Sequence, residues 1–216
     1  MMNIGIISDI HGDLDGLESA IRQLRDRGAA HIICAGDLVD KGSEPDAVAA
    51  LIKAQNIPCV QGNHDHEAIK HQAWVRQFGN MQLEEWRKQL LKDETVAYLE
   101  TLPQTLSFTW EGISVLLTHG TPWSRDTYLF PMSFPKAFRR VADEAKTEVV
   151  ILGHTHEPMI VDVGGVCLII NPGSVYRQHY ESSPRRTCGL LTLPDLQFTV
   201  IDIDSEKPIT PEQVRV

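Results

Sequence analysis

Residues 3–13 read NIGIISDIHGD, an apolar run that ends in an aspartate and a histidine two positions apart. The run Asn3–Ser8 is typical of a short buried strand. Side chains two positions apart on an extended chain point the same way, so Asp9 and His11 could reach one ion together. Because a DxH pair alone is common at surface turns, its interpretation depends on the motifs that follow it along the chain.

Strands and helices alternate after this first strand. Apolar residues recur at spacings of three and four between Leu14 and Leu24, which predicts a helix with Asp13 at its N-cap and Gly28 as its stop. The next predicted elements are a strand, a helix and a strand, at residues 31–35, 44–55 and 57–61. This order predicts parallel βαβ units and therefore an α/β fold.

The remainder of the chain breaks this rhythm. Residues 65–104 are largely polar and helix-favouring, which predicts a helical insertion at one edge of a single domain spanning 1–216. Turn signals predict three hairpins, at residues 105–118, 159–170 and 189–203. A helix ending near Lys146 and a buried strand at 149–152 separate the first hairpin from the second. The polar tail from Asp204 is expected to be loosely held.

Five predicted strand ends carry side chains that can bind metal ions. They are Asp9-Ile10-His11, Gly36-Asp37, Gly62-Asn63-His64-Asp65, His119-Gly120 and Gly153-His154-Thr155-His156. Ligands of open α/β sheets gather at the carboxyl ends of strands. Each motif alone is weak, but five of them on strand ends predict one shared site.

The ordered motifs resemble the calcineurin-like metallophosphoesterase superfamily. The likeness rests on DxH, GDxVxxG (residues 36–42), GNHD, HG and GHxH, and NPGSV at 171–175 is similar to a turn of its small single-domain bacterial and archaeal phosphodiesterases. It implies a four-layer sandwich, in which two mixed β-sheets are flanked by helices. It also implies a binuclear phosphoesterase that hydrolyses small phosphodiesters or phosphomonoesters by means of a metal-bridging hydroxide.

The same resemblance implies the ligands of two divalent metal ions. The first would take Asp9, His11, Asp37 and His156, and the second would take Asp37, Asn63, His119 and His154, with Asp37 as the bridge. The donors are nitrogen and oxygen, and four of them are histidines. Manganese, iron, zinc, cobalt or nickel is therefore favoured over magnesium, which prefers oxygen.

His64 is not a ligand in the family pattern, and the resemblance implies that it protonates the leaving group as a general acid. The carboxylate that orients it would be Asp40, by resemblance to the GDxVDxG form of phosphoprotein phosphatases, or Asp65, the local alternative. Those phosphatases have Arg where this chain has Lys41. A lysine is a point charge and not a bidentate fork, so a phosphate clamp at this position is in doubt.

Several further residues are candidates for substrate contact. The loop after His119 holds Trp123, Arg125, Tyr128 and Phe130. Its aromatic side chains could stack on a base or an aryl leaving group, and Arg125 could bind a phosphate. Lys41 and Tyr176 could also face the substrate. The same centre would suit a protein phosphatase or a dinucleoside-polyphosphate hydrolase, and a noncatalytic scaffold of the same fold is the alternative from another class.

Composition limits the partners and the compartment. The 216 residues carry a net charge of −9, which argues against nonspecific nucleic-acid binding and against docking on anionic membranes, and the expected partner is a small phosphate ester. Neither a membrane span nor a signal peptide is expected. The four cysteines lack CxxC spacing and lie in apolar runs, which predicts reduced thiols in a cytoplasmic protein. Four histidines are expected to be structural or solvated: His31, His66, His71 and His179.

Overall fold

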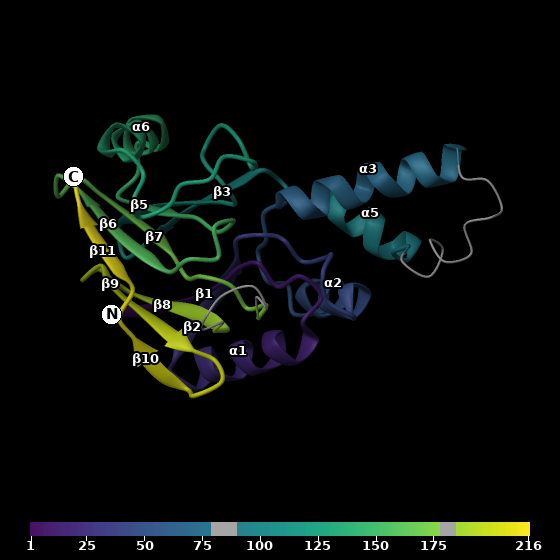
Figure 1. The fold of residues 1–216 in the computed structure, drawn as a ribbon. Helices are drawn as coiled ribbons and strands as arrows, with labels where there is room; N and C mark the ends of the chain where they lie inside the picture. Colours follow the sequence, from purple (N-terminus) through teal and green to yellow (C-terminus); the bar gives the residue numbers. More distant parts are fainter. Residues whose placement is uncertain (79–89, 178–184) are drawn as a thin grey trace.

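Two mixed β-sheets form the centre of the structure, a computed structural model that describes residues 1–78, 90–177 and 185–216 (Figure 1). The first sheet has the order β10-β9-β8-β1-β2, with strands at Met2–Ile7 (β1), Ala29–Cys34 (β2), Thr187–Leu193 (β8), Gln197–Asp202 (β9) and Lys207–Ile209 (β10). The second has the order β11-β6-β7-β5-β4-β3, with strands at Thr105–Trp110 (β3), Ile113–Thr118 (β4), Val149–Ile151 (β5), Met159–Val163 (β6), Cys167–Asn171 (β7) and Glu212–Arg215 (β11). Parallel and antiparallel pairs occur in both sheets.

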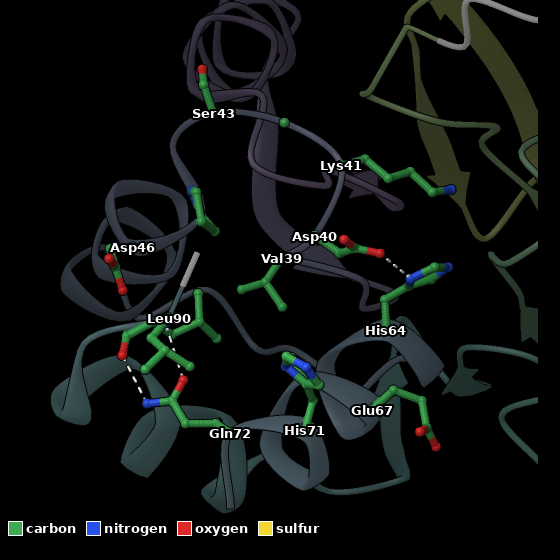
Figure 2. Close-up of a pocket in the computed structure, with 14 residues that line it drawn as sticks. Val39, Asp40, Lys41, Ser43, Asp46, His64, Glu67, His71, Gln72 and Leu90 are labelled. Carbon is green, nitrogen blue, oxygen red and sulfur yellow. Dashed lines mark hydrogen bonds and ion pairs between the residues drawn. The ribbon is translucent and has the colours of Figure 1, made fainter. Parts of the chain in front are cut away.

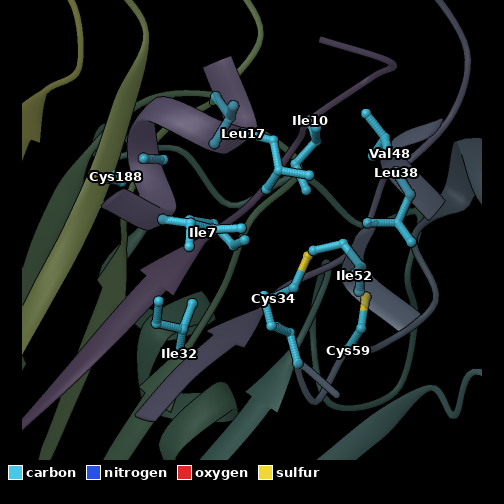
Figure 3. Close-up of a cluster of buried hydrophobic side chains, with 14 of the residues drawn as sticks. Ile7, Ile10, Leu17, Ile32, Cys34, Leu38, Val48, Ile52, Cys59 and Cys188 are labelled. Carbon is cyan, nitrogen blue, oxygen red and sulfur yellow. The ribbon is translucent and has the colours of Figure 1, made fainter. Parts of the chain in front are cut away.

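Helices cover the outer face of each sheet. Helices α1 (Leu14–Asp26) and α2 (Pro45–Ala54) pack with β1 and β2 in one apolar cluster, part of which Figure 3 shows around Leu17 and Ile52. Helix α6 (Pro135–Ala145) packs Phe138 and Val141 against the second sheet. As the apolar stripe predicts, α1 begins after Asp13, whose carboxylate accepts a hydrogen bond from the amide of Gly16 at 2.8 Å.

A third apolar cluster fills the space between the two sheets. Its buried members come from both sheets, among them Ile4, Ile6, Ile33, Val149, Ile151, Ile170 and Leu191. The order is therefore helices, sheet, sheet and helix. This confirms the α/β sandwich with two mixed sheets flanked by helices, and it leaves the strand ends at the rims of the sheets as places for polar side chains.

The segment predicted as a helical insertion contains α3 (Asn63–Phe78) and α5 (Asp93–Thr101), which lie side by side and extend from the sheets in Figure 1. Residues 79–89, which also belong to the predicted insertion, follow α3 in the sequence and lie outside the described part of the chain. The amide of Gln72 joins the two helices, because it donates to the carbonyl of Leu91 at 2.8 Å and accepts from the Leu91 amide at 3.0 Å. Helix α3 begins at Asn63, two residues earlier than predicted.

Two predictions made from local patterns are wrong. Residues 57–61 form no strand. Among them, only Cys59 makes a β-bridge, to Cys34. Pro58 has no amide hydrogen, so it contributes only its carbonyl to the backbone hydrogen bonds. The tail from Asp204 is not loose, since β10 pairs with β9 and β11 pairs with β6. Backbone pairing with two sheet edges holds this polar segment, and its side-chain composition does not reveal that.

The predicted hairpin of β3 and β4 is confirmed residue for residue, and Glu111 and Gly112 form its turn. The four cysteines are free and buried, as their apolar surroundings predict. Across the described residues, the helices are too short or too polar to cross a bilayer.

Burial predicts the stability effect of matched valine substitutions. Val150 in β5 is 0% exposed and Val166 in the turn after β6 is 72% exposed. We expect Val150→Ala to lower the free energy of unfolding by about 2 kcal/mol, because two buried methyl groups and their packing are lost. Val166→Ala should change it by less than about 0.5 kcal/mol. Urea denaturation measures both values, and equal effects would contradict this picture of the core.

Candidate metal centre

The five predicted motifs meet at one edge of the sheets, where β1, β2, β4 and β5 end. The backbone here turns sharply, and non-glycine residues adopt positive φ at Asp9, His11, Asp37, Asp40, Lys41, His154 and His156. Such conformations cost free energy and cluster at functional sites. The extended geometry expected for Asp9 and His11 is therefore wrong, because β1 ends at Ile7 and a turn directs both side chains inward.

One group of side chains combines Asp9, His11 and His156. The Nε2 atom of His156 lies 3.1 Å from Oδ1 of Asp9 and 3.2 Å from Nε2 of His11. The Nε2 atom of His11 lies 3.9 Å from the same Asp9 oxygen. These three ligand atoms lie within 4.8 Å of one another, which is a spacing that one ion can span.

A second group combines Asp37, Asn63, His119 and His154. The Nε2 atom of His119 lies 3.2 Å from Oδ2 of Asp37 and 2.9 Å from Oδ1 of Asn63. Ligand atoms of Asp37, His119 and His154 also lie within 4.8 Å of one another. The second group thus brings together residues from the ends of β2, β4 and β5 and the first turn of α3.

Asp37 lies between the two groups. Its Oδ2 atom is 3.2 Å from His119 in one group and 3.7 Å from His11 in the other. Its Oδ1 atom accepts a hydrogen bond from the amide of His64 at 2.9 Å, which orients the carboxylate. Close packing also matters here, because a Cβ on Gly62 would lie 2.0 Å from Oδ1 of Asp37.

Hydrogen-bond acceptor atoms of the two groups face one another. The Nδ1 atoms of His11 and His119 lie 3.2 and 2.7 Å from the carbonyls of Val39 and Ala35, and a carbonyl can only accept. In a neutral imidazole this leaves the lone pair on Nε2, facing the centre. Within the described residues, Asp9 Oδ1, Asp37 Oδ2 and His154 Nε2 are buried without a hydrogen-bond partner. Facing acceptors in a buried place fit a cation.

Burial and neighbouring charges together set the protonation states of these groups. Burial lowers the pKa of His11 and of His154 to about 4. Burial opposes ionisation of Asp9 and Asp37, but His156 and His119 respectively outweigh it and hold both pKa values below the usual range. Ionised carboxylates and neutral imidazoles are the forms that bind a metal.

The pKa of His119 is shifted in the opposite direction from the pKa values of His11 and His154. Burial lowers the pKa of His119, but the charge of Asp37 outweighs this effect and raises the pKa to about 10. A divalent cation at this position would take the place of the proton.

His64 lies at the rim of the centre with a carboxylate behind it. Its Nδ1 atom is 2.7 Å from Oδ2 of Asp40, and this hydrogen bond raises the pKa of His64 and lowers that of Asp40 to about 2. Asp65, the other candidate partner, is buried and accepts hydrogen bonds from the amides of Asp37 at 2.9 Å and Gly62 at 3.0 Å. It also accepts from the amide of Leu38 at 2.8 Å. Asp65 therefore holds two loops together, and Asp40 is the carboxylate in contact with His64.

Comparison with known proteins identifies the family. The model of the calcineurin-like phosphoesterase superfamily domain matches residues 2–195. The chain belongs to this superfamily. A phosphodiesterase from Methanocaldococcus jannaschii is 27% identical over 212 residues, which are 95% of this chain and 95% of the relative.

Solved structures agree with this assignment. A metallophosphoesterase from Sphaerobacter thermophilus has a TM-score of 0.67 and 27% identity, covering 92% of this chain and 86% of that one. A hypothetical protein from Pyrococcus horikoshii, at 16% identity, has the same fold with a TM-score of 0.74, covering 94% of this chain and 88% of that one. The protein is thus a phosphate-ester hydrolase of a family that uses divalent metals.

Of the four residues predicted to contact substrate, Lys41 and Tyr176 contact His11 of the centre. Nζ of Lys41 lies 3.4 Å from Nε2 of His11, and the ring of Tyr176 packs edge-on against His11 at 5.8 Å. Arg125 donates a hydrogen bond to the side chain of Gln61. The guanidinium of Arg140 lies 4.0 Å above the ring of Trp123.

A cavity of about 690 Å³ opens beside His64, between the loop after β2 and helix α3 (Figure 2). Asp40, Lys41 and His64 line the side next to the centre, and Glu67 and His71 line the side on α3. In Figure 2, His64 points toward Asp40 at the edge of this space. His64 thus lies between the candidate ligand groups and this cavity.

The histidines predicted to lie outside the centre do so where the structure describes them. His31 stacks on Trp110 with ring centroids 5.6 Å apart. His66 and His71 lie on α3, away from the ligand groups. His179 lies outside the described residues.

Sequence reasoning named several supporting residues but missed their roles. Tyr128 stacks on the imidazole of His154 with ring centroids 3.8 Å apart. In the NPGSV turn, Asn171 donates to the carbonyl of Gly153 at 2.7 Å, and Ser174 donates to the carbonyl of Asp9 at 2.9 Å. The NPGSV motif itself was a usable signal for the last two. Tyr128 was visible only as one aromatic residue among four in its loop.

The hydrogen bonds of Asp65 predict a structural role that can be measured. We expect Asp65→Asn to lower the free energy of unfolding by about 2–3 kcal/mol, because an amide nitrogen would replace an acceptor in front of buried N–H donors. Metal content should fall as well, since Asp65 positions the amides beside Asp37. Urea denaturation and metal analysis test this, with the exposed Asp195→Asn as the matched control. Wild-type stability in Asp65→Asn would contradict it.

Proposed function

We propose that the phosphoesterase holds two divalent metal ions that share Asp37. The first site would consist of Asp9, His11, Asp37 and His156, and the second of Asp37, Asn63, His119 and His154. The observation that carries the proposal is the position of Asp37 Oδ2, which lies 3.7 Å from His11 and 3.2 Å from His119 and has no hydrogen-bond partner. The nitrogen-rich donor set favours manganese, iron, zinc, cobalt or nickel over magnesium.

When bound, two such ions would activate a water and neutralise phosphate oxygens. The protein's own residues prepare that chemistry. Ser8 donates to Oδ2 of Asp9 at 2.5 Å, and the amide of His154 donates to the same oxygen at 3.0 Å, so the other oxygen faces the centre. The carbonyls of Val39 and Ala35 orient His11 and His119 in the same way.

His64 would act as the general acid for the leaving group. Asp40 occupies its Nδ1, so Nε2 is the atom available to the substrate. The oxygen of a water that has released one proton to solvent would form the new bond to phosphorus, the bond from phosphorus to the leaving oxygen would break, and the proton on Nε2 would pass to that oxygen. The ring of His64 is close to the centre, because one of its nitrogens lies within 4.8 Å of ligand atoms of His11 and Asp37, a spacing that would also let His64 bind an ion.

The substrates would be small phosphodiesters or phosphomonoesters, with Arg125, Lys41, Trp123 and Tyr176 as the candidate contacts. A protein phosphatase or a dinucleoside-polyphosphate hydrolase would use the same centre, so phosphopeptides and dinucleoside polyphosphates belong in the substrate panel.

We also propose that residues 1–216 form one domain with an insertion at about 65–104. Four buried free thiols support a reducing, cytoplasmic compartment.

The shared carboxylate predicts a metal stoichiometry. Metal-reconstituted protein should bind two ions per chain and hydrolyse bis(p-nitrophenyl) phosphate or p-nitrophenyl phosphate, and a chelator should abolish turnover. His156→Ala should retain about one ion, whereas Asp37→Ala should lose both, because only Asp37 is a ligand in both groups. Elemental analysis of dialysed protein distinguishes the variants. A fully metallated protein inert to the whole panel would refute the enzymatic proposal.

The role of His64 predicts a loss that depends on the leaving group. His64→Ala should keep both ions and lose about 10²–10⁴-fold in kcat for an alkyl leaving group, which needs a proton. The loss should be smaller for p-nitrophenolate, which leaves readily as an anion. Asp40→Asn should add little to His64→Ala in a double-mutant cycle, because both act through one imidazole. Loss of metal in His64→Ala would show that the side chain is a ligand instead.

A further inference from the structure

An aromatic and basic surface borders the metal centre, and the proposed function uses only Trp123 of it, as a candidate substrate contact. It belongs to the connection between β4 and α6 and to the first turns of α6, and it comprises Trp123, Tyr128, Phe134, Lys136, Arg139 and Arg140. Phe134 is 76% exposed, Tyr128 is 55% exposed and Trp123 is 37% exposed. Several exposed aromatic side chains in one segment of the chain make that segment a candidate for a binding site.

This aromatic and basic surface continues into the second ligand group. Tyr128 stacks on the imidazole of His154 at 3.8 Å and on Phe130 at 5.7 Å. In the same loop, Arg125 donates to the side chain of Gln61, two residues before Asn63. A molecule whose phosphate lies at the metal centre would therefore extend directly onto these rings.

The charge of this segment is opposite to that of the whole chain. Residues 121–146 carry five Lys and Arg against three Asp and Glu, whereas the chain has a net charge of −9. The cations lie beside the rings, with Arg140 4.0 Å above Trp123 and Lys136 6.0 Å from Phe134. Each pair places an aromatic face next to a group that binds phosphate.

We propose that this surface binds the bases and phosphates of a short single-stranded oligonucleotide whose scissile phosphodiester lies at the metal centre. Aromatic platforms interleaved with Arg and Lys bind single strands through base stacking. A duplex would not fit this mode, because its bases are already stacked on one another. The inference rests on the proposed function, to which it adds a substrate class.

The net charge of −9 is compatible with this mode of binding. Single-strand binding by stacking also depends on salt, but the cations that it needs can be concentrated in one segment of an acidic chain. An anionic lipid surface is the competing partner for exposed aromatic and basic side chains. Because this surface continues into a proposed metal ligand, a substrate that enters the centre is favoured as its partner, rather than a flat bilayer.

Binding can be measured apart from hydrolysis. In the presence of a chelator, fluorescence anisotropy should show that the protein binds a fluorescein-labelled oligothymidylate at least tenfold more tightly than an abasic strand with the same number of phosphates. Trp123→Ala and Phe134→Ala should each remove about tenfold of this preference. Trp74→Ala changes an exposed tryptophan on α3, which extends away from α6 in Figure 1, and should have no effect. Equal affinity for both strands would overturn the proposal, as would binding to phosphatidylserine vesicles but not to the oligonucleotide.

A hydrolysis assay is the second test of this proposal. Thymidine 5′-p-nitrophenyl phosphate and methyl p-nitrophenyl phosphate share a leaving group and differ in the nucleoside. The ratio of their kcat/KM values should favour the nucleoside ester about tenfold in the wild type and approach one in Trp123→Ala. If both esters react equally well, the oligonucleotide proposal fails while the phosphoesterase proposal stands. If neither reacts, the proposed function fails, and the binding measurement alone decides whether this surface recognises bases.

Discussion

Two carboxylates that are almost completely removed from water, Asp9 and Asp37, are the constraint on which this structure depends. They are 0% and 1% exposed, and each has one oxygen without a hydrogen-bond partner. Burying a carboxylate costs several kcal/mol unless opposite charge compensates it. The imidazole of His119, whose pKa is raised to about 10, supplies part of that charge, and the arrangement of facing acceptors suits divalent cations for the rest.

The surrounding fold holds these acceptors against their mutual repulsion. Positive φ at Asp9, His11 and Asp37 directs three ligands inward, at a cost on the order of 1–3 kcal/mol each. Two packed sheets make such turns tolerable, because the strands that precede them are buried on both faces. Asp65 and Ser174 then secure the turns by hydrogen bonds to their backbone atoms.

Local patterns predicted the elements whose formation depends on their own residues. The hairpin of β3 and β4 follows from alternation around Glu111 and Gly112, and α1 follows from its apolar stripe and its cap at Asp13. The same reasoning failed for residues 57–61 and for the tail. There, the outcome depends on which strand edge is available for pairing, and the sequence nearby does not contain that information.

By itself, the sequence determined the order and identity of the candidate ligand residues, the family to which the chain belongs, and the edge of the sheets where these residues would meet. The tertiary structure alone decided that Asp40 contacts His64 while Asp65 clamps two loops, and that Tyr128 covers His154. Adjacent residues such as His64 and Asp65 have similar local sequence contexts but point in different directions. Those directions are set by helix geometry and by contacts with segments distant in the chain, and only the folded molecule brings these segments together.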